Sequence, residues 1–215
     1  MNEPGFPRPA GVILAGGRSS RLGPGSKAMI PLGGKPMIHH VIERLAPQAD
    51  PLLLSVQDEA ANIDAAGLVT VPDAVQRHRG PLTGLYSAMH HVFRHTDKEW
   101  LLLCPCDAPF IPADLARRLI AHALKYDKPV SVACYEEVPQ PTFSLWHRAV
   151  LSRVKAAVMS EGKGGLMYML DQLPYCAVDW QPNRVAPFFN VNTRADLQMA
   201  EQLLKQALDD GQPAG

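Results

Sequence analysis

The amino-acid sequence predicts a three-layer α/β/α fold around a largely parallel β-sheet. Three observations lead to this fold class. Short apolar runs alternate with helical patterns along much of the 215-residue chain, which indicates successive β–α units. Polar or glycine-rich segments follow these apolar runs, where strands of a parallel sheet would end. Proline, with 20 residues, is used at about twice its average frequency, which indicates many sharp junctions between strands and helices.

The first half of the chain contains four apolar runs that we expect to be buried strands. They cover residues 11–15, 51–56, 68–71 and 100–104. Helices are expected between them and after the last one, over residues 36–45, 80–93 and 112–126. Pro36 and Pro112 suit the first turn of a helix, where the missing N–H would have no partner in any case.

The second half shows a less regular pattern. Strands are expected at 130–135, 142–146 and 176–180, with a helix at 147–159 and a last helix after Thr193. Thr193 and Asp196 have the spacing of a weak capping box at the start of that helix. We expect a single domain over residues 11–208, a disordered or extended lead-in over 1–10 and a tail over 209–215.

Composition excludes several classes of partner. The 21 Lys and Arg residues balance 21 Asp and Glu residues, so we expect no nucleic-acid partner. No run approaches 18 apolar residues and the first ten lack the apolar core of a signal peptide, so we expect no membrane partner and a cytoplasmic protein. The cysteine pair Cys104 and Cys106 is a poor zinc signal without a second pair nearby; with Cys134 and Cys176, these are expected to be buried thiols.

The segment from Gly11 to Pro36 contains no carboxylate and is rich in glycine. Its cations are Arg18, Arg21, Lys27 and Lys35. Glycine lets backbone N–H groups approach phosphate oxygens, and Arg and Lys add charge-assisted hydrogen bonds. The composition favours a polyphosphate site, with a solvated surface loop as the alternative. The Walker pattern does not fit, because Pro36 follows Gly34-Lys35 where that pattern has Ser or Thr. The dinucleotide fingerprint does not fit either, because Gly23-Pro24-Gly25 lacks the third glycine that it requires.

Polar side chains also follow the other expected strands. In an open α/β sheet, ligands bind beyond the carboxyl ends of the strands, where Ser55, Asp73 and Asp107 would lie with the basic loop. Asp107, framed by two prolines, suits a Mg²⁺ ion that also binds phosphates. The alternatives are a helix cap for Asp107 and a turn residue for Asp73.

Four sequence blocks together resemble the signature of the molybdenum cofactor guanylyltransferases, over about residues 11–205. The first is Leu14-Ala15-Gly16-Gly17-x-x-x-Arg21-Leu22-Gly23, continued by Lys27 and Pro31-Leu32-x-Gly34-Lys35-Pro36. The others are Gly80-Pro81-Leu82-x-Gly84, Pro105-Cys106-Asp107-x-Pro109-Phe110 and Asn190-Val191-Asn192-Thr193. The chain departs from the family pattern at Ser26, where the family commonly has Asp, and at Ser55, where it often has Asn.

This resemblance implies a Rossmann-like nucleotidyltransferase (GT-A-like) fold and an enzyme that transfers GMP from Mg-GTP to molybdopterin or the molybdenum cofactor, releasing pyrophosphate. It implies nucleotide contacts from Leu14, Ala15, Gly16, Gly17, Lys27, Ser55, Asp73, Gly80 and Asp107. Arg21, Lys27 and Asp107 would be catalytic, and Asp107 would bind Mg²⁺. Asn190 and Asn192 would bind the acceptor, unless Asn192 touches the metal. Proteins of molybdenum insertion and molybdoenzyme maturation are the expected protein partners.

Two other functions stay open from the sequence. One is a nucleotidyltransferase with another base or acceptor, such as a molybdopterin cytidylyltransferase or a sugar-phosphate nucleotidyltransferase. In the family that the chain resembles, the Gly-Gly of the first loop and the Gly-Pro-Leu block occur in enzymes that use a guanine nucleotide. The resemblance therefore favours GTP over CTP as the substrate. The other is a nucleotide-binding or partner module without enzymatic turnover. Release of pyrophosphate from GTP and molybdopterin would exclude this second alternative.

Overall fold

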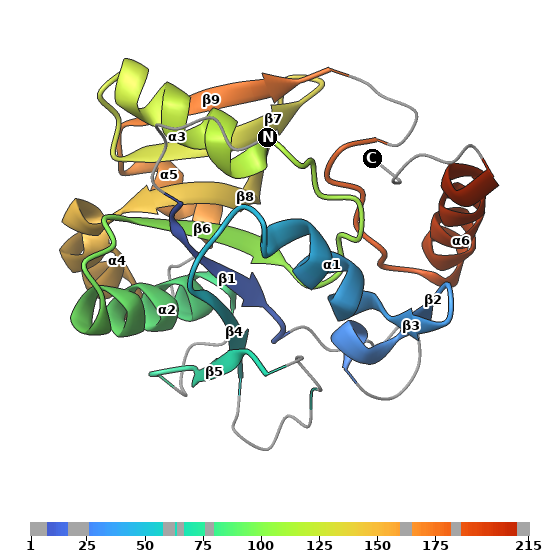
Figure 1. Ribbon diagram of the computed structural model, residues 1–215. Helices are drawn as coiled ribbons and strands as arrows, with labels where there is room; N and C mark the ends of the chain where they lie inside the picture. The colour runs from blue at the N-terminus through green and yellow to red at the C-terminus, as the bar shows by residue number, and fades with distance from the viewer. Residues whose placement is uncertain are drawn as a thin grey trace.

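A central β-sheet with helices on both faces organises the chain (Figure 1). The structure is a computed structural model that describes residues 8–16, 26–57, 63, 67–75, 80–159, 165–181 and 186–209. The sheet strands are β1 Ala10–Leu14, β4 Leu52–Val56, β5 Val69–Pro72, β6 Trp100–Pro105, β7 Val130–Tyr135, β8 Val138–His147 and β9 Tyr175–Trp180. The lead-in and tail expected from the sequence lie largely outside the described residues.

The sheet is mostly parallel, as the sequence predicts. Its strand order is β5-β4-β1-β6-β8-β7-β9, and β8 alone among these seven runs antiparallel to its neighbours. The carboxyl ends of β5, β4, β1 and β6 therefore lie at one edge of the sheet. That edge receives the polar segments that follow those strands in the sequence.

The helices bury both faces of the sheet. They are α1 Met37–Leu45, α2 Pro81–His95, α3 Leu115–Lys125, α4 Leu151–Met159, α5 Leu166–Asp171 and α6 Arg194–Asp209, with 3₁₀ turns η1 Lys27–Met29 and η2 Arg148–Val150. Along β1, Ile13 packs into the core shared with α1 and α3, and Val12 into the core shared with α2, α4 and α5. Successive strand residues point to opposite faces, so an apolar run such as β1 indicates a strand covered on both sides.

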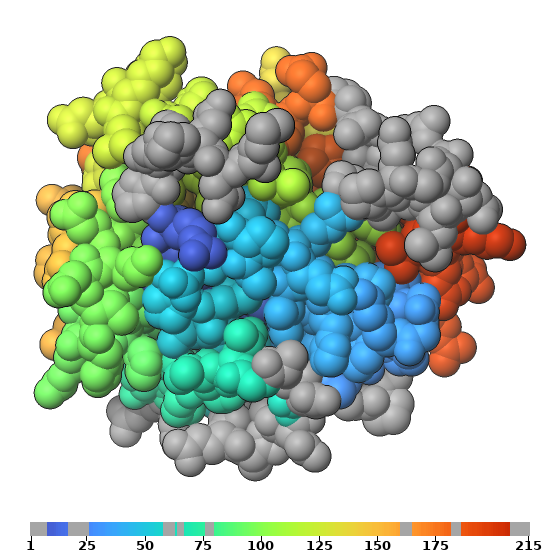
Figure 2. Space-filling view, in the orientation of Figure 1, coloured from blue at the N-terminus to red at the C-terminus, as the bar shows by residue number. Residues whose placement is uncertain are grey.

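A third, smaller apolar cluster joins α6 to the rest of the protein. It contains Leu32, Met37, Phe110, Val191 and Ala200. Figure 2 shows α1 near the centre of one face of the molecule, with α2 to its left and α6 at the right edge. Among the helices of the described segments, none is both long and apolar enough to cross a membrane.

The strand and helix pattern expected from the sequence is found, with several local differences. The helix expected over 147–159 is divided into the 3₁₀ turn η2 and the helix α4, and α5 was not predicted. Pro36, expected in the first turn of a helix, is instead the N-cap of α1. The helix expected from Pro112 begins at Leu115, because residues 112–114 form a turn closed by the Leu115 N–H donating to Pro112 O (3.2 Å). The strand expected over 142–146 extends over Val138–His147. A hairpin of β2 Pro31–Leu32 and β3 Lys35–Pro36 was not predicted.

The geometry of the turn between β2 and β3 explains why glycine occupies both of its positions. Gly33 (φ +58°) and Gly34 (φ +86°) both have left-handed backbones, which a two-residue hairpin turn requires and which glycine adopts without strain.

The capping box at the last helix is confirmed: the Asp196 N–H donates to Thr193 Oγ1 (3.2 Å), and the Thr193 N–H donates to Asp196 Oδ2 (2.8 Å).

Strand β8 contains a bulge held by a buried side-chain clamp. On β7, Val132 and Ala133 are consecutive, but their partners on β8 are Ser144 and Gln140, so residues 141–143 have no partner on β7. Ser144 Oγ donates to Pro141 O (2.6 Å) and accepts from Trp146 Nε1 (2.7 Å). The Ser144 hydroxyl thus bridges the bulge to the regular strand.

Replacing Ser144 by alanine is expected to lower the free energy of unfolding by about 1–3 kcal/mol, because the buried Trp146 indole N–H loses its acceptor. Urea denaturation followed by tryptophan fluorescence measures this. Ser152→Ala, at an exposed position of α4, is the matched control. Equal midpoints for the two variants would contradict the clamp.

Candidate functional site

A cavity of about 380 Å³ opens at the carboxyl edge of the parallel strands, at the lower end of the size range of small-molecule sites. Its lining comes from the ends of β1, β4, β5 and β6, the 3₁₀ turn η1, the first turns of α2, the bulge of β8 and the segment before α6. The lining residues are Leu14, Gly16, Lys27, Ser55, Val56, Gln57, Asp73, Gly80, Pro81, Gly84, Pro105, Cys106, Asp107, Thr142, Asn190 and Asn192.

The structure brings most of the site residues expected from the sequence to this cavity. Nine of them line it: Leu14, Gly16, Lys27, Ser55, Asp73, Gly80, Asp107, Asn190 and Asn192. Ala15 is buried beside it, and its N–H donates to Ser55 O (2.8 Å). Gly17 and Arg21 lie outside the described residues.

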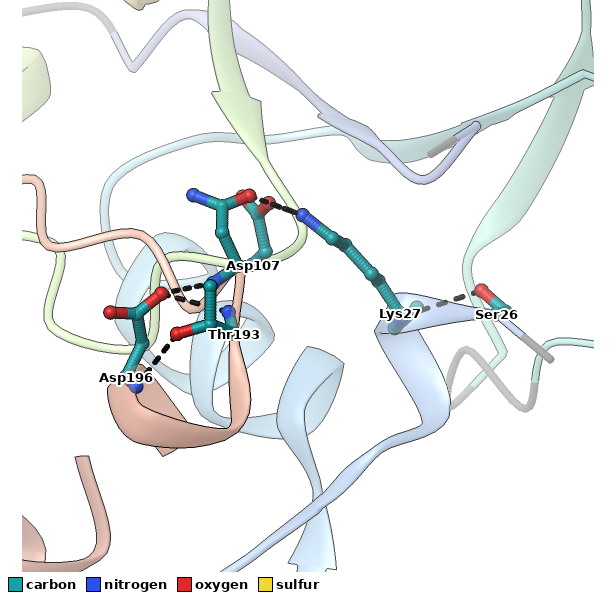
Figure 3. Close-up of polar contacts among 7 residues, drawn as sticks. Ser26, Lys27, Asp107, Thr193 and Asp196 are labelled. Atoms are coloured by element: carbon teal, nitrogen blue, oxygen red, sulfur yellow. Dashed lines mark hydrogen bonds and ion pairs between the residues drawn. The ribbon is translucent and has the colours of Figure 1, made fainter. Parts of the chain in front are cut away.

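At one end of the cavity, the Lys27 ammonium joins three segments that are far apart in sequence (Figure 3). Lys27 Nζ donates to Asp107 Oδ2 at 2.9 Å and also to Asn192 Oδ1. The Lys27 and Asp107 side chains are 15% and 16% exposed. A carboxylate oxygen and an amide oxygen therefore converge on one cation position, in a partly desolvated place where electrostatic attraction is stronger than in water.

Local hydrogen bonds position Lys27 and Asn192. Ser26 is the N-cap of η1, and its Oγ accepts from the Ala28 N–H (3.3 Å). This is a role that serine and aspartate both perform well, which accounts for serine at a position where the family commonly has aspartate. The Asn192 N–H donates to Asp196 Oδ2 (2.9 Å), which fixes Asn192 to the first turn of α6.

The Asp196 carboxylate is stabilised in its ionised form. Desolvation acts to raise its pKa, but hydrogen bonds from Asn192 and Thr193 outweigh desolvation and lower the pKa below its ordinary value. The cap that holds Asn192 is therefore charged at neutral pH.

Asp107 is fixed through its backbone. Its carbonyl oxygen accepts from the Val191 N–H (2.8 Å), and the neighbouring Cys106 N–H donates to Leu14 O (3.1 Å). The helix-cap alternative for Asp107 is wrong, because the next helix begins at Leu115 with Asp114 at its N-cap.

Cys106 is among the lining residues, and its buried thiol stays protonated. Burial, and then the nearby Asp107 carboxylate, raise its pKa to about 12. The cysteines are all free; Cys104, Cys106 and Cys134 are buried and Cys176 is partly exposed.

At two glycines of the cavity lining, Gly16 and Gly84, the glycine backbone packs closely against the side chains of other lining residues. A Cβ on Gly84 would lie 2.7 Å from Leu14 Cδ2 and from Ser55 Oγ. A Cβ on Gly16 would lie 2.7 Å from Gln57 Cγ. Both distances are shorter than carbon and oxygen atoms tolerate, so a side chain at either position would move the lining.

Three lining residues, Val56, Gln57 and Thr142, were neither selected as site residues from the sequence nor contained in the sequence motifs. Gln57 directly follows β4, so the strand-end rule that selected Ser55 was sufficient to find it. Thr142 lies on the antiparallel strand β8, for which that rule gives no expectation.

Asn190 contributes an unsatisfied oxygen to the site. Its Oδ1 is buried and has no hydrogen-bond partner in the described part of the chain, although Asn190 lines the cavity. A buried acceptor without a partner is costly, so a ligand that donates a hydrogen bond there would be favoured.

Comparison with known proteins gives consistent matches. Residues 11–176 match the family model described as the MobA-like NTP transferase domain. The molybdenum cofactor guanylyltransferase of Photobacterium profundum is 36% identical over 195 residues, which cover 90% of this chain and 95% of that protein. The structure of molybdopterin-guanine dinucleotide biosynthesis protein A from Archaeoglobus fulgidus superposes with a TM-score of 0.76 at 19% identity, over 92% of this chain and 99% of that one. A manganese complex of Rv0371C from Mycobacterium tuberculosis has the same fold, with a TM-score of 0.63 at 18% identity over 90% and 97% of the two chains.

Proposed function

The chain belongs to the MobA-like NTP transferase family, and from this premise we propose that it transfers GMP from Mg-GTP to molybdopterin or the molybdenum cofactor, releasing pyrophosphate. It is a nucleotidyltransferase of molybdenum cofactor biosynthesis. Lys27 contacts Asp107 and Asn192 at the carboxyl edge of the sheet. This contact is the main support for placing the reaction in this cavity.

The proposed reaction joins two phosphates. A terminal phosphate oxygen of the acceptor attacks the α-phosphorus of GTP and forms a new P–O bond, while the bond from that phosphorus to the β-phosphate oxygen breaks. Pyrophosphate leaves with the electron pair of that bond. A phosphate monoester has a second pKa near 6, so the attacking oxygen is mostly ionised at neutral pH and needs no general base.

The protein must therefore supply positioning and positive charge, since two anions have to approach each other. Lys27 and Arg21 would hold the phosphates, and Asn190 and Asn192 would meet the acceptor. The side-chain oxygen of Asn190 supports binding of the molybdopterin substrate. It is buried and has no hydrogen-bond partner within the described segments, so it could accept a hydrogen bond from an N–H or O–H group of that substrate.

The nucleoside would occupy the end of the cavity formed by β1, β4, β5 and α2. The contacts proposed there come from Leu14, Ala15, Gly16, Gly17, Ser55, Asp73 and Gly80. The Ala15 N–H is already used by Ser55 O, so contact from Ala15 with the base would come from its carbonyl oxygen.

The residues around Lys27 fit a divalent cation. Asp107 and Asn192 offer a carboxylate and an amide oxygen to the same cation, and Mg²⁺ usually combines one or two carboxylates with substrate phosphates. Asp107 would hold Mg²⁺, and Asn192 is close enough to the same cation position to join it. When bound, the ion would neutralise phosphate charge.

The cellular setting is part of this proposal. Four free cysteines agree with the reducing cytoplasm, where thiols persist. The product and its precursor would pass between this enzyme and proteins of molybdenum insertion and molybdoenzyme maturation.

An assay with purified protein, GTP, Mg²⁺ and molybdopterin tests the function through pyrophosphate release and through the dinucleotide product. CTP in place of GTP gives the comparison for base selectivity. Product from CTP but not GTP would favour the cytidylyl alternative. Nucleotide binding without pyrophosphate release would exclude turnover.

Replacing Gly84 by alanine is expected to raise the KM for GTP by about 5- to 100-fold, because the new Cβ would displace Leu14 or Ser55 and overpacking costs about 1–3 kcal/mol. Steady-state kinetics with GTP varied at saturating molybdopterin measures this. Gly165→Ala is the matched control, because Gly165 has φ −87° and an added Cβ there meets no atom within 4 Å. A wild-type KM in Gly84→Ala would contradict the tight contact.

A further inference from the structure

We propose that Thr142 binds the acceptor, with its hydroxyl donating a hydrogen bond to the phosphate monoester that attacks GTP. This inference rests on the proposed function, and it assigns a side chain that the sequence motifs do not contain. Thr142 is the one residue of β8 that lines the described cavity, which it shares with Asp107, Asn190 and Asn192.

The β8 bulge is what brings Thr142 to the cavity. Residues 141–143 have no partner on β7, and bulges commonly re-aim a side chain beside an active site. On the next two positions, the Phe143 and Ser144 side chains are fully buried, whereas Thr142 is partly exposed. The Ser144 hydroxyl fixes the bulge by donating to Pro141 O (2.6 Å).

An aromatic cluster links this bulge to the asparagine segment. The Phe143 and Phe188 rings lie 4.7 Å apart between centroids, and Trp180 packs edge-on against Phe188 at 5.3 Å. Phe188 has a left-handed backbone (φ +67°), a conformation that non-glycine residues keep only when their surroundings enforce it. The same cluster therefore positions Thr142, which precedes Phe143, and Asn190, which follows Phe188 by two residues.

The sheet order places Thr142 on the acceptor side. Along the sheet, β5, β4 and β1 lie on one side of β6, and β8 lies on the other. The proposed nucleoside contacts come from the first side, and Asp107 follows β6 itself. A phosphate that approaches the α-phosphorus from the β8 side would meet Thr142 and the asparagines before it meets the nucleoside contacts.

The hydroxyl is suited to this task because it is a neutral donor. It can orient the acceptor phosphate without adding another full positive charge beside the attacking oxygen. Thr142→Val keeps the shape of the side chain and removes the donor, and Thr142→Ser keeps the donor.

The test measures initial rates with molybdopterin and with GTP varied separately. We expect Thr142→Val to raise the KM for molybdopterin about five- to tenfold, the effect of losing one hydrogen bond, and to leave the KM for GTP unchanged. The KM of Thr142→Ser for molybdopterin is expected to stay within about twofold of the wild-type value, because serine keeps the hydroxyl donor. Thr70→Val, on the exposed edge strand β5, is the matched control, and thermal melting checks that each variant folds.

The outcomes separate this inference from the proposed function. Wild-type protein that makes no product from GTP and molybdopterin overturns the proposed function. An active wild type with an unchanged molybdopterin KM in Thr142→Val overturns the role of Thr142. A rise in the GTP KM alone would place Thr142 against the nucleotide, and that also overturns it. If Thr142→Val does not fold, Thr142→Ala takes its place against Thr142→Ser, with the same outcomes.

Discussion

Replacing Asp107 by alanine is expected to lower the rate of GMP transfer by about 100- to 1000-fold, the effect of removing one preorganised electrostatic group from an active site. The side chain contacts Lys27 at the cavity, and it is the proposed ligand of Mg²⁺. Its removal would leave Lys27 without its carboxylate partner and the metal without its proposed carboxylate ligand.

The fold should survive this substitution. Asp107 joins the neighbouring segment through its carbonyl oxygen, which accepts from the Val191 N–H (2.8 Å), and alanine keeps that bond. Turnover at saturating Mg²⁺ measures the effect, and the melting temperature shows that the protein is folded. Asp171→Ala, at an exposed position at the end of α5, is the matched control. Full activity of Asp107→Ala in Mg²⁺ would rule out the metal role.

The sequence predicted the parallel half of the site because one rule governs it. Apolar runs long enough to be buried strands predict a parallel sheet, and residues just after such strands meet at one edge. Ser55, Asp73 and Asp107 were selected in this way, and all three line the cavity. The rule needs only strand ends, which the apolar pattern marks well.

The rest of the site depends on contacts that no local pattern encodes. Thr142 reaches the cavity through a bulge on an antiparallel strand, and the bulge is fixed by the buried Ser144 and Trp146. Asn192 meets Lys27 across 165 positions of sequence. Only the resemblance to a family, and not spacing or composition, had suggested an acceptor role for Asn190 and Asn192.

Lys27 gives the sharpest test of how the cavity divides between phosphates and nucleoside. Replacing Lys27 by alanine is expected to weaken GTP binding by about 10- to 100-fold, since a hydrogen bond to a charged group contributes roughly 1.5–3 kcal/mol. GMP lacks the β- and γ-phosphates, so its affinity should fall by much less. Lys27 contacts Asp107 and Asn192, so the proposed triphosphate would compete with these two side chains for the ammonium group.

Isothermal titration of wild type and Lys27→Ala with GTP and with GMP, both in Mg²⁺, measures the two losses. Lys155→Ala, at an exposed position of α4, shows the effect of removing a lysine away from the cavity. Equal weakening of GTP and GMP would mean that Lys27 meets the α-phosphate or the nucleoside, and the phosphate end of the cavity would then have to be sought elsewhere. A selective loss of GTP, together with an inactive Asp107→Ala, would place the triphosphate between these two side chains, with β1 and β4 left to hold the nucleoside.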